Sequence, residues 1–563
     1  MSKTKRIASI CMAAALSAAM VTSVTACTTP EELVKDGKTV NVKVYSAGYG
    51  TRYIYEMEKK FEAAYAEEGY KLNIFTPQAG FNGEKFLQDI ATGAGADLYI
   101  GSQVTEDLLQ QYPNSVYDIT DSVANKKPIG FNGEEVGDKT IAQILDENTY
   151  GYTALQKSDG TYYAMPWTAG MRGLLVNTKV LGDYNLETPK TSKEFFDCYE
   201  TIMATADDTG VFPITNFAGE TEYPMSFVNC WLAQYQGYDW YQQLFSFENS
   251  DGSAMTKTQV LDLIDGADGL EIMLENMFHA LDPNCATFGS QTQNVEAAQA
   301  KLMTNKCAFM MNGDWFISET YSNYEDAQRA NIEFLPVPVI SELGVKVFGA
   351  GTAYNKSETV CEAILRAIVD EVDLNKSVAE IKAVIDQEFT MDVATSDIQV
   401  IAEARGYTNI ENAESGMYIN QGSEVKEIAS LFVRMCCSQE GGKLIAENTY
   451  SSNPFAMEYE TSRYKSVNQA RALLTNQYFQ GIRHNVTGHR KQMANSALDN
   501  AGFINFFPST GIYFNLRITE KNVSIYNEET LEKIGTTAAY KSAAGELATT
   551  IYNDLRDNAK YVW

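Results

Sequence analysis

Basic side chains are scarce in this chain. Lysine and arginine together number 44, against 73 aspartate and glutamate residues, so the formal net charge is -29 at pH 7. Nucleic acids and anionic lipid surfaces are bound mainly through clustered lysine and arginine side chains, which neutralise their phosphates. The charge balance therefore argues against a nucleic-acid partner and against direct electrostatic binding to a membrane surface.

Cysteine and histidine are also few. Seven cysteines follow Cys27, an odd number with neither a CxxC pair nor metal-type spacing: Cys198, Cys230, Cys285, Cys307, Cys361, Cys436 and Cys437. We expect no disulfide framework and interpret these cysteines as small core residues. His484 and His489 are the only closely spaced histidines, and a zinc site would need further ligands. Since P-loop and Gly-x-Ser-x-Gly motifs are missing too, we expect no metal, no cofactor and no catalytic residues.

Long apolar runs are missing after the N-terminal region. The N-terminal run, residues 7–21, is shorter than the ~20 residues that a bilayer-spanning helix needs. Three basic residues precede it and small residues follow it, an order that is typical of a secretory signal peptide. The sequence therefore predicts a signal peptide over residues 1–26.

The segment Val24-Thr-Ala-Cys27 resembles a bacterial lipobox. In that motif the cysteine is diacylated and becomes the first residue of the mature protein. The resemblance implies a lipid anchor at Cys27 and a short tether over residues 27–38. The protein would then be extracytoplasmic and attached to the cell membrane through this anchor only. The alternative is an ordinary signal peptide in which Cys27 is incidental.

Aromatic residues, by contrast, are abundant. The chain has 33 Tyr, 26 Phe and 5 Trp, and 45% of its 563 residues are hydrophobic. A chain of this length and composition can build two lobes with substantial cores. We expect most aromatic side chains in those cores, but aromatic planes are also the surfaces on which sugar rings stack.

Strand and helix patterns alternate at the start of the mature chain. Periodicity predicts, in order, a strand over 39–45, a helix over 52–68, a strand over 71–75, a helix over 83–92 and a strand over 96–100. This order predicts a parallel sheet with right-handed crossovers. In such sheets the ligand crevice lies beyond the carboxyl ends of the strands, so the loops at Tyr49 and Ser102 are expected to face it.

Several segments follow one another along the chain in an order that is typical of one protein family. They are the opening strand with its glycine loop, Gly95-Ala-Asp-Leu-Tyr99, Gly160-Thr-Tyr-Tyr-Ala-Met-Pro166, Gly173-Leu-Leu-Val-Asn177, Thr188-Pro-Lys-Thr191, the run from Ala297 to Trp315, and Gln439-Glu-Gly-Gly-Lys-Leu444. Together they resemble the carbohydrate-type extracellular solute-binding proteins of bacterial ABC transporters. The resemblance implies an α/β chain with a two-lobe type II periplasmic-binding-protein fold, hinge strands and helical insertions.

The resemblance also implies how the chain divides between the lobes. Lobe 1 is expected to hold residues 39–170 and 337–454, and lobe 2 residues 171–336 and 455–563. The chain would cross near 168–174, return near 335–339 and cross again near Pro454. A helix-patterned insertion near 357–424 and a long stretch after Glu460 depart from the family pattern.

A sugar site needs flat aromatic faces surrounded by polar groups that bind hydroxyls. The resemblance implies that Trp315 is the stacking tryptophan, with Asp314 and Asn312 beside it as hydroxyl-binding candidates, although Asn-Gly is also a turn signal. Trp167 precedes the expected hinge and either stacks on sugar or packs beneath the hinge. The other candidates in lobe 2 are Tyr223, Glu220 and Trp231, and for Trp231 the alternative is core packing. Near strand ends or the hinge the candidates are Tyr49, Ser102, Gln103 and Arg172, and for these the alternative is loop solvation.

These features predict a monomeric, lipid-anchored binding protein of an ABC importer. It would capture an oligosaccharide, deliver it to the permease subunits and carry out no reaction. One rival is an exported glycoside hydrolase, which also needs aromatic residues together with two carboxyl groups ~5 to 9.5 Å apart. A second rival is a surface lipoprotein that binds peptides. The order of the segments and the missing hydrolase motif favour the sugar-binding protein.

Overall fold

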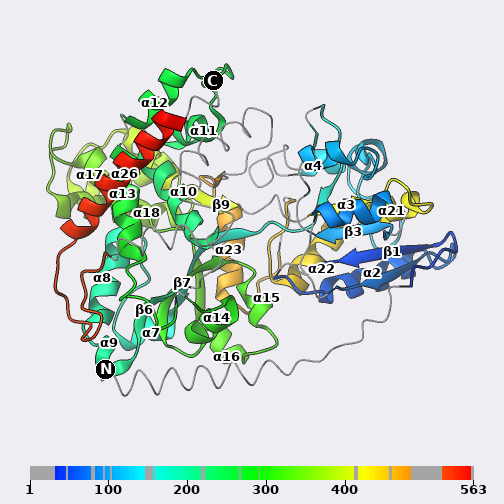
Figure 1. Cartoon of the computed structure of the whole chain (residues 1–563), viewed down its shortest axis with the longest axis horizontal. Coiled ribbons are helices and arrows are strands. Elements are labelled where there is room, and N and C mark those ends of the chain that lie inside the picture. Colours follow the sequence, from blue (N-terminus) through cyan, green and yellow to red (C-terminus); the bar gives the residue numbers. More distant parts are fainter. Residues whose placement is uncertain are drawn as a thin grey trace.

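The chain folds into two lobes, each built around one β-sheet (Figure 1). The computed structural model describes residues 32–45, 48–77, 83–92, 95–101, 104, 106–145, 156–157, 159–216, 222–265, 268–290, 292–410, 416–455, 459–482 and 523–558. The expected signal peptide and Cys27 lie outside these ranges, as do Ser102, Gln103, Glu220, His484 and His489. In the part that is described, no helix combines the length and apolar character that crossing a bilayer requires.

Lobe 1 contains a five-stranded sheet with the strand order β2-β1-β3-β10-β4. Its strands are β1 (Thr39–Val44), β2 (Lys71–Phe75), β3 (Leu98–Gly101), β4 (Met165–Pro166) and β10 (Gly416–Ile419). The first three strands pair in parallel, as the alternation of strand and helix patterns predicts, whereas β10 runs antiparallel to β3 and β4. The late strand β10 therefore lies between β3 and β4, inside a sheet whose first strands come from the N-terminal residues.

Helices cover both faces of this sheet (Figure 1). They are α2 (Arg52–Ala64), α3 (Gly83–Ala91), α4 (Glu106–Gln111), the π-helical turn η1 (Thr120–Ala124), α5 (Ile141–Ile144), α21 (Lys426–Cys436) and α22 (Gln439–Thr449). The apolar residues of β1, Val40, Val42 and Val44, are fully buried in the same core as Phe61 of α2 and Phe432 of α21.

Lobe 2 contains a larger sheet with the order β11-β9-β5-β7-β6, and β8 also pairs with β5. Its strands are β5 (Met171–Asn177), β6 (Phe212–Thr215), β7 (Cys307–Gly313), β8 (Ile332–Leu335), β9 (Tyr407–Ile410) and β11 (Gln480–Ile482). Side chains of β5 alternate between two cores, because Leu174 and Val176 enter one and Met171 and Leu175 enter the other. The sheet is therefore packed on both faces.

Many helices surround this second sheet. They are α7 (Thr178–Asp183), α8 (Ser192–Met203), α9 (Ala206–Thr209), α10 (Glu222–Gln236), α11 (Tyr238–Ser246), α12 (Lys257–Asp265), α13 (Asp268–Ala280), α14 (Val295–Met303), α15 (Phe316–Thr320), α16 (Asp326–Arg329), α17 (Glu342–Phe348), α18 (Glu358–Asp373), α19 (Val378–Phe389), α20 (Thr395–Gly406), α23 (Lys465–Leu474) and α26 (Ala538–Asn558). Local capping starts several of them. The side chain of Asn177, for example, accepts hydrogen bonds from two backbone N–H groups of α7.

The division of the chain between the lobes differs from the expected one. The chain leaves the first sheet after β4 and enters the second at β5, but it returns only between β9 and β10, not near 335–339. Residues 337–410 therefore belong to lobe 2, and the placement of all of 337–454 in lobe 1 is wrong for that part. The final crossing lies between Phe455, in the core of lobe 1, and Tyr464, in a core of lobe 2.

The helices α18 to α20 of the polar insertion are attached to lobe 2 by apolar and ionic contacts. Cys361 and Ile364 of α18 share a core with Phe195 of α8. Lys190, just before α8, pairs with Asp370 at 2.6 Å and with Asp373 at 2.8 Å, both of them on α18. Because these partly buried pairs sit beside a shared core, the helical part of the insertion is an integral part of lobe 2.

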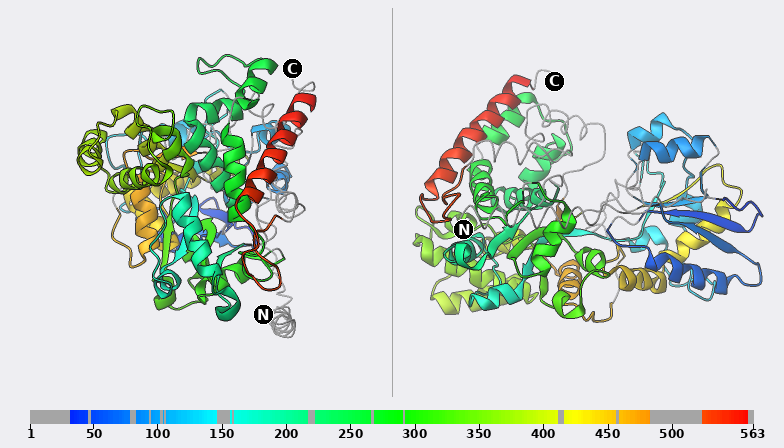
Figure 2. Two further views of the ribbon diagram at one scale, coloured as in Figure 1. Left: turned by 90° about the vertical axis from the view of Figure 1, so that its left-hand side faces the viewer. Right: turned by 60° about the horizontal axis from the view of Figure 1, so that its bottom comes forward.

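The C-terminal helix α26 lies along α13 on the outer side of lobe 2, shown in red in Figure 2. Its Tyr540 hydroxyl donates a 2.6 Å hydrogen bond to Asp282, which follows α13. The ring of Tyr540 also stacks on His279, which in turn stacks on Phe196 at a centroid distance of 3.8 Å. Burial lowers the pKa of His279 to about 3, so this imidazole is neutral in the folded protein.

The seven cysteines from Cys198 onward are all buried and free of disulfides. Burial raises the pKa of Cys198 and of Cys230 to about 12, which keeps both thiols protonated. This agrees with their interpretation as small core residues.

Candidate ligand-binding site at the junction of the lobes

Aromatic side chains from both lobes meet where the lobes touch. Trp315 follows β7 of lobe 2, and its indole lies 5.9 Å from the ring of Tyr49, which follows β1 of lobe 1. Tyr49 also contacts Trp167, at 5.4 Å, in an edge-to-face arrangement. Tyr223 of α10 completes the group at 5.9 Å from Trp315. The structure therefore brings together four aromatic residues that the sequence singles out separately.

The position of Trp315 is unusual for a lobe 2 residue. Its side chain packs in the core of lobe 1, and its exposed fraction is only 6%. Tyr49 and Trp167 are 5% and 1% exposed. The aromatic faces thus cover one another in this conformation, and a ligand can reach them only if the lobes move apart.

Two glycines allow the lobes to approach this closely. A Cβ atom on Gly170 would lie 2.5 Å from the Tyr49 hydroxyl and 3.1 Å from the Trp315 indole. A Cβ on Gly48 would lie 2.8 Å from Glu319 of lobe 2, and Gly48 also has a φ of +82°, which other residues rarely adopt. A side chain at Gly170 would force Tyr49 and Trp315 to shift, whereas one at Gly48 would first displace the carboxylate of Glu319.

Polar contacts reinforce the junction. The Ser318 hydroxyl of α15 donates a 2.8 Å hydrogen bond to the carbonyl of Tyr49. The guanidinium of Arg172 lies 5.3 Å from the ring centre of Tyr223, a cation–π distance, and holds that ring beside Trp315. Arg172 is buried and belongs to β5, the strand that enters lobe 2 from the crossing segment.

Asp314 is a buried carboxyl next to the aromatic group. One oxygen accepts a 3.3 Å hydrogen bond from the Met171 N–H, and the other has no partner among the described residues. Burial raises the pKa of Asp314 to about 7, although the Met171 N–H and the charge of Arg471 act in the opposite direction. A carboxyl group in this state can accept or donate a hydrogen bond near neutral pH.

Several other buried polar atoms near the junction also lack hydrogen-bond partners in the described ranges. They are the Tyr53 hydroxyl, the Trp167 indole N–H, the Ser452 hydroxyl and the Asn453 side-chain NH2. Tyr53 stacks on Trp167 at 4.6 Å, and Ser452 pairs with Ala169 of the crossing segment. Buried polar groups are nearly always satisfied, so such a group of unsatisfied ones favours a place for bound water or ligand hydroxyls.

Two expected contacts lie elsewhere. Trp231 of α10 is fully buried in the core of lobe 2, where its indole N–H donates to the Pro338 carbonyl at 3.0 Å. Asn312 is fully buried within β7, opposite Gly173 of β5, and its side-chain oxygen accepts from the Gly313 N–H. Neither side chain faces the junction surface in this conformation, because each is enclosed by its own lobe, and we leave both out of the candidate site.

Tyr53 and Arg471 are junction residues that the sequence did not single out. Tyr53 lies in the first turn of α2, four residues after Tyr49, so its nearness to Tyr49 in the sequence was a usable signal for it. Arg471 of α23 donates to the Ala446 carbonyl at 3.0 Å and to Ser451, and thereby ties lobe 2 to lobe 1. Nothing in the local sequence marks Arg471, because its partners are backbone carbonyls from another segment.

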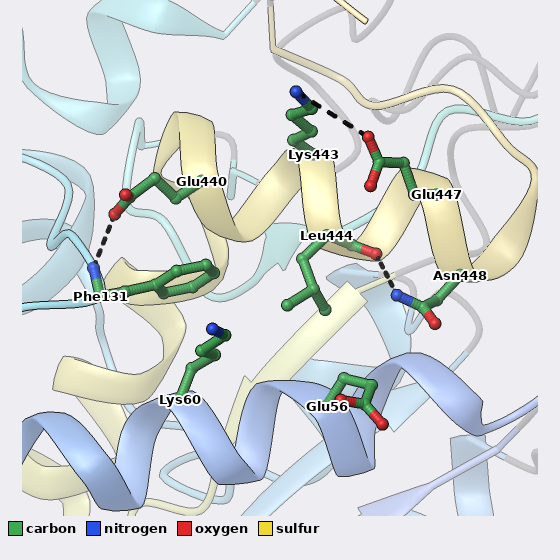
Figure 3. A pocket seen from close by; sticks show the side chains of 8 residues that line it. All are labelled: Glu56, Lys60, Phe131, Glu440, Lys443, Leu444, Glu447 and Asn448. Carbon is green, nitrogen blue, oxygen red and sulfur yellow. Dashed lines mark hydrogen bonds and ion pairs between the residues drawn. The ribbon is translucent and has the colours of Figure 1, made fainter. Parts of the chain in front are cut away.

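A separate groove of about 430 Å³ lies on lobe 1 between α2 and α22 (Figure 3). Its charged groups are matched within the protein: Glu440 accepts from the Phe131 N–H at 2.7 Å, and Lys443 pairs with Glu460 at 2.6 Å. The groove contains a single aromatic ring, Phe131, and involves no residue of lobe 2. It lacks the features of a sugar site between lobes.

A metal site would need several ligating side chains close together in the residues that the structure describes. No group of three or more His, Cys, Asp or Glu side chains there has the geometry to hold a metal ion.

Comparison with known proteins identifies a family. The model of the family described as "Bacterial extracellular solute-binding protein" matches residues 56–369, which is more than half of the chain. No curated protein matches the sequence.

Solved structures share the fold at low sequence identity. A "Chitin oligosaccharide binding protein" has a TM-score of 0.51 and 11% identity, over 92% of this chain and 99% of that one. "SBP RafE in complex with raffinose" has a TM-score of 0.49 and 10% identity over 91% and 99% of the two chains. A family 1 extracellular solute-binding protein from Bifidobacterium longum subsp. infantis has a TM-score of 0.47 and 13% identity over 91% and 98%. The first likeness confirms the predicted α/β fold with two lobes.

Proposed function

This chain belongs to the family of bacterial extracellular solute-binding proteins, and from that membership we propose that it captures an oligosaccharide between its two lobes. The family places the protein outside the cytoplasm. The proposal adds the chemical class of the ligand and the surface that receives it.

The observation that carries the proposal is the aromatic group formed by Tyr49, Trp167, Tyr223 and Trp315. Its rings come from both lobes, so a ligand held between them would contact both lobes at once. Ligand contacts to both lobes at once favour closure of a hinged protein on its ligand. Sugar rings have apolar faces that suit indole and phenol planes, and neutral sugars need no cluster of opposite charge.

The polar groups beside the rings support the same ligand class. Asp314, the Trp167 indole N–H and the Ser452 hydroxyl each have hydrogen-bonding capacity that the described residues leave unused. Sugar hydroxyl groups both donate and accept, so they can satisfy a carboxyl oxygen, an indole N–H and a hydroxyl together. A purely apolar ligand would leave all three unsatisfied.

The proposed cellular role is that of the binding component of an ABC importer. The lipobox-like segment ending at Cys27 supports a lipid anchor that would keep the protein near its permease. The chain would work as a monomer and carry out no reaction on the sugar.

Calorimetry and thermal shift with chito-oligosaccharides, xylo-oligosaccharides, raffinose and short peptides test the ligand class. We expect at least one oligosaccharide to bind, to raise the melting temperature and to be recovered intact after incubation. Release of shorter sugars would favour the glycoside hydrolase. Stabilisation by peptides and by no sugar would overturn the proposed function.

A further inference from the structure

A second contact between the lobes lies beside the aromatic group. Arg52, the first residue of α2 in lobe 1, places its guanidinium 5.1 Å from the ring centre of Tyr321, which follows α15 in lobe 2. The same guanidinium lies 5.6 Å from the ring of Tyr450, which follows α22. The two rings stack on each other with centroids 5.4 Å apart. Arg52 therefore spans a pair of stacked rings contributed by different lobes.

Each lobe holds its own part of this contact in place. In lobe 2, the buried Arg329 donates to the Tyr321 carbonyl at 2.9 Å and also lies 4.9 Å from the Tyr321 ring. In lobe 1, Arg52 donates to the Asn448 carbonyl of α22 at 3.2 Å. The helices α2 and α22 pack side by side, as the walls of the groove in Figure 3 show. The two halves are thus preformed on separate lobes.

Two local features of these residues are unfavourable by themselves. Arg52 puts a positive charge at the N-terminus of α2, where the helix dipole disfavours it, and no acidic residue in the first turn compensates. Tyr450 has a φ of +54°, a left-handed conformation that costs free energy for a bulky residue. Such costs persist where the surrounding structure or the function requires the conformation. For both Arg52 and Tyr450, the contact with the ring of Tyr321 is the favourable interaction that offsets this cost.

The contact also belongs to the same two segments as the candidate site. Arg52 comes three residues after Tyr49, and Tyr321 comes six residues after Trp315. Movement that separates Tyr49 from Trp315 must therefore also strain or break the contact of Arg52 with Tyr321.

We propose that Arg52, Tyr321 and Tyr450 form a latch between the lobes that sets how far they are apart before ligand binds. Arg52 is a positioning residue in this arrangement, since it touches no part of the candidate ligand surface. A protein whose binding-competent arrangement is only partly populated binds more weakly by that fraction. The latch thereby also sets the apparent affinity, and this second consequence rests on the proposed function.

Small-angle X-ray scattering of the ligand-free protein tests the latch without knowledge of the ligand. We expect Arg52→Gln to increase the radius of gyration and broaden the distance distribution, and Arg52→Lys to restore part of the effect. Lys59→Gln is the matched control, because Lys59 lies on the same helix and its ion pair among the described residues is with Glu56 of that helix. Equal scattering curves for wild type and Arg52→Gln would overturn the latch.

Tyr450→Asn separates the latch from a merely structural role. Asparagine tolerates the left-handed conformation, so the melting temperature should stay equal or rise. A latch predicts that the radius of gyration nevertheless increases, as in Arg52→Gln. An unchanged radius in Tyr450→Asn would show that the ring only fills space.

Titration with raffinose and chito-oligosaccharides measures the second consequence. For whichever of these sugars binds the wild type, we expect Arg52→Gln to strengthen binding about two- to fivefold, the size of one exposed cation–π contact, because loss of the latch uncovers the rings more often. If no sugar binds wild type but the scattering effect is present, the latch stands and the proposed ligand class fails. If sugars bind and scattering is unchanged, the ligand class stands and the latch fails.

Discussion

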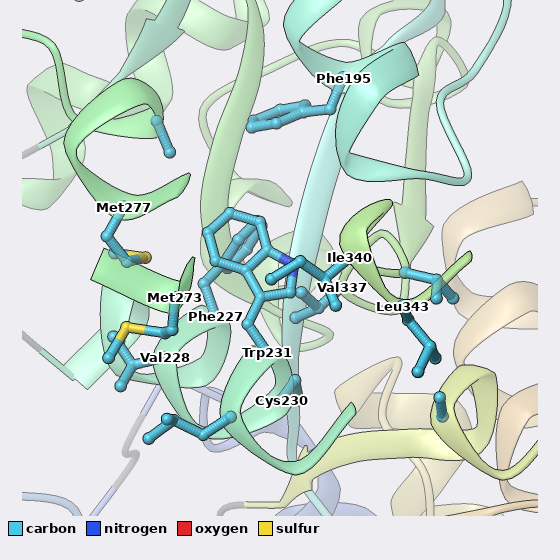
Figure 4. Close-up of a cluster of buried hydrophobic side chains, with 14 of the residues drawn as sticks. Phe195, Phe227, Val228, Cys230, Trp231, Met273, Met277, Val337, Ile340 and Leu343 are labelled. Atoms are coloured by element: carbon cyan, nitrogen blue, oxygen red, sulfur yellow. The ribbon is translucent and has the colours of Figure 1, made fainter. Parts of the chain in front are cut away.

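The environments of Trp231 and Trp315 are similar in burial but differ in the lobes that supply the surrounding side chains. Trp231 lies in the core of lobe 2 among Phe227, Met273 and Ile340 (Figure 4), and its indole N–H has a backbone acceptor. Trp315 is also nearly buried, but its ring neighbours include Tyr49 of the opposite lobe. The residue before it, Asp314, is a buried carboxyl with one oxygen that has no partner among the described residues. A closed apolar core and a surface covered by another lobe therefore give similar burial. The lobes that supply the surrounding side chains distinguish them, because the neighbours of Trp231 belong to lobe 2 and those of Trp315 come from both lobes.

The largest effect is expected for Trp231→Ala, which removes the core residue of this pair. Truncating a fully buried tryptophan leaves a cavity and costs about 3–5 kcal/mol of stability. Denaturant unfolding measures this loss. A change below about 1 kcal/mol would mean that the core around Trp231 is loosely packed, and the contrast with Trp315 would disappear.

Asp314→Asn is expected to change how stability depends on pH. The folded carboxyl keeps its proton up to a pKa of about 7, whereas an unperturbed aspartate has a pKa of 3.8. The folded state therefore binds the extra proton between these values, so its stability is full below pH 3.8 and falls as the pH rises to 7. The loss is on the order of 4 kcal/mol, and the asparagine variant should not show it.

Melting temperatures from pH 4 to pH 8 measure this difference. Wild type and Asp314→Asn should agree best at pH 4, and the variant should be the more stable protein at pH 8. The exposed Asp138→Asn in lobe 1 serves as the control, since it should follow the wild-type profile. Parallel profiles for wild type and Asp314→Asn would show that Asp314 does not titrate in this range.

Trp315→Ala is expected to weaken sugar binding by more than tenfold while the protein remains folded. An aromatic anchor at the centre of a binding surface can contribute more than about 1.4 kcal/mol. Trp240→Ala is the control, because Trp240 is only partly buried and its indole N–H donates to Leu263 in lobe 2. Unchanged affinity in Trp315→Ala, measured by calorimetry, would remove Trp315 from the site.

Tyr53→Phe should give the smallest effect of these substitutions. Its hydroxyl is buried without a partner among the described residues, so deleting it should leave the free energy of unfolding unchanged or raise it by up to about 1 kcal/mol. If that hydroxyl serves a ligand, the same variant should bind sugar more weakly. Stability lost together with unchanged binding would assign the hydroxyl to the core.

Much of the fold could be predicted because its signals are local. The alternating residues of β1 and β2 gave strands at 39–45 and 71–75, and the structure has them at Thr39–Val44 and Lys71–Phe75. The helix expected over 52–68 ends earlier, at Ala64, because hydrogen bonds from Gly69 and Tyr70 to the Tyr65 carbonyl form a turn instead. The predicted family and two-lobe fold are confirmed.

The lobe boundary could not be predicted in the same way. The apolar stripe of α18 shows that one face of the helix is buried, but not which lobe buries it. That was decided by Phe195 and by the ion pairs of Lys190, which lie about 170 residues earlier in the chain. The site shows the same limit, since Trp231 and Trp315 carry no local difference that separates core from junction.

The order of apolar, glycine and aromatic residues was enough to specify the secondary structure, the family and a set of aromatic candidates, because these depend on contacts within a few residues. Which rings face each other, which carboxyl loses its water and which arginine bridges the lobes depended on contacts between distant segments. Only the folded chain brings Tyr49 to Trp315 and Arg52 to Tyr321, since burial and hydrogen bonding are properties of neighbours in space.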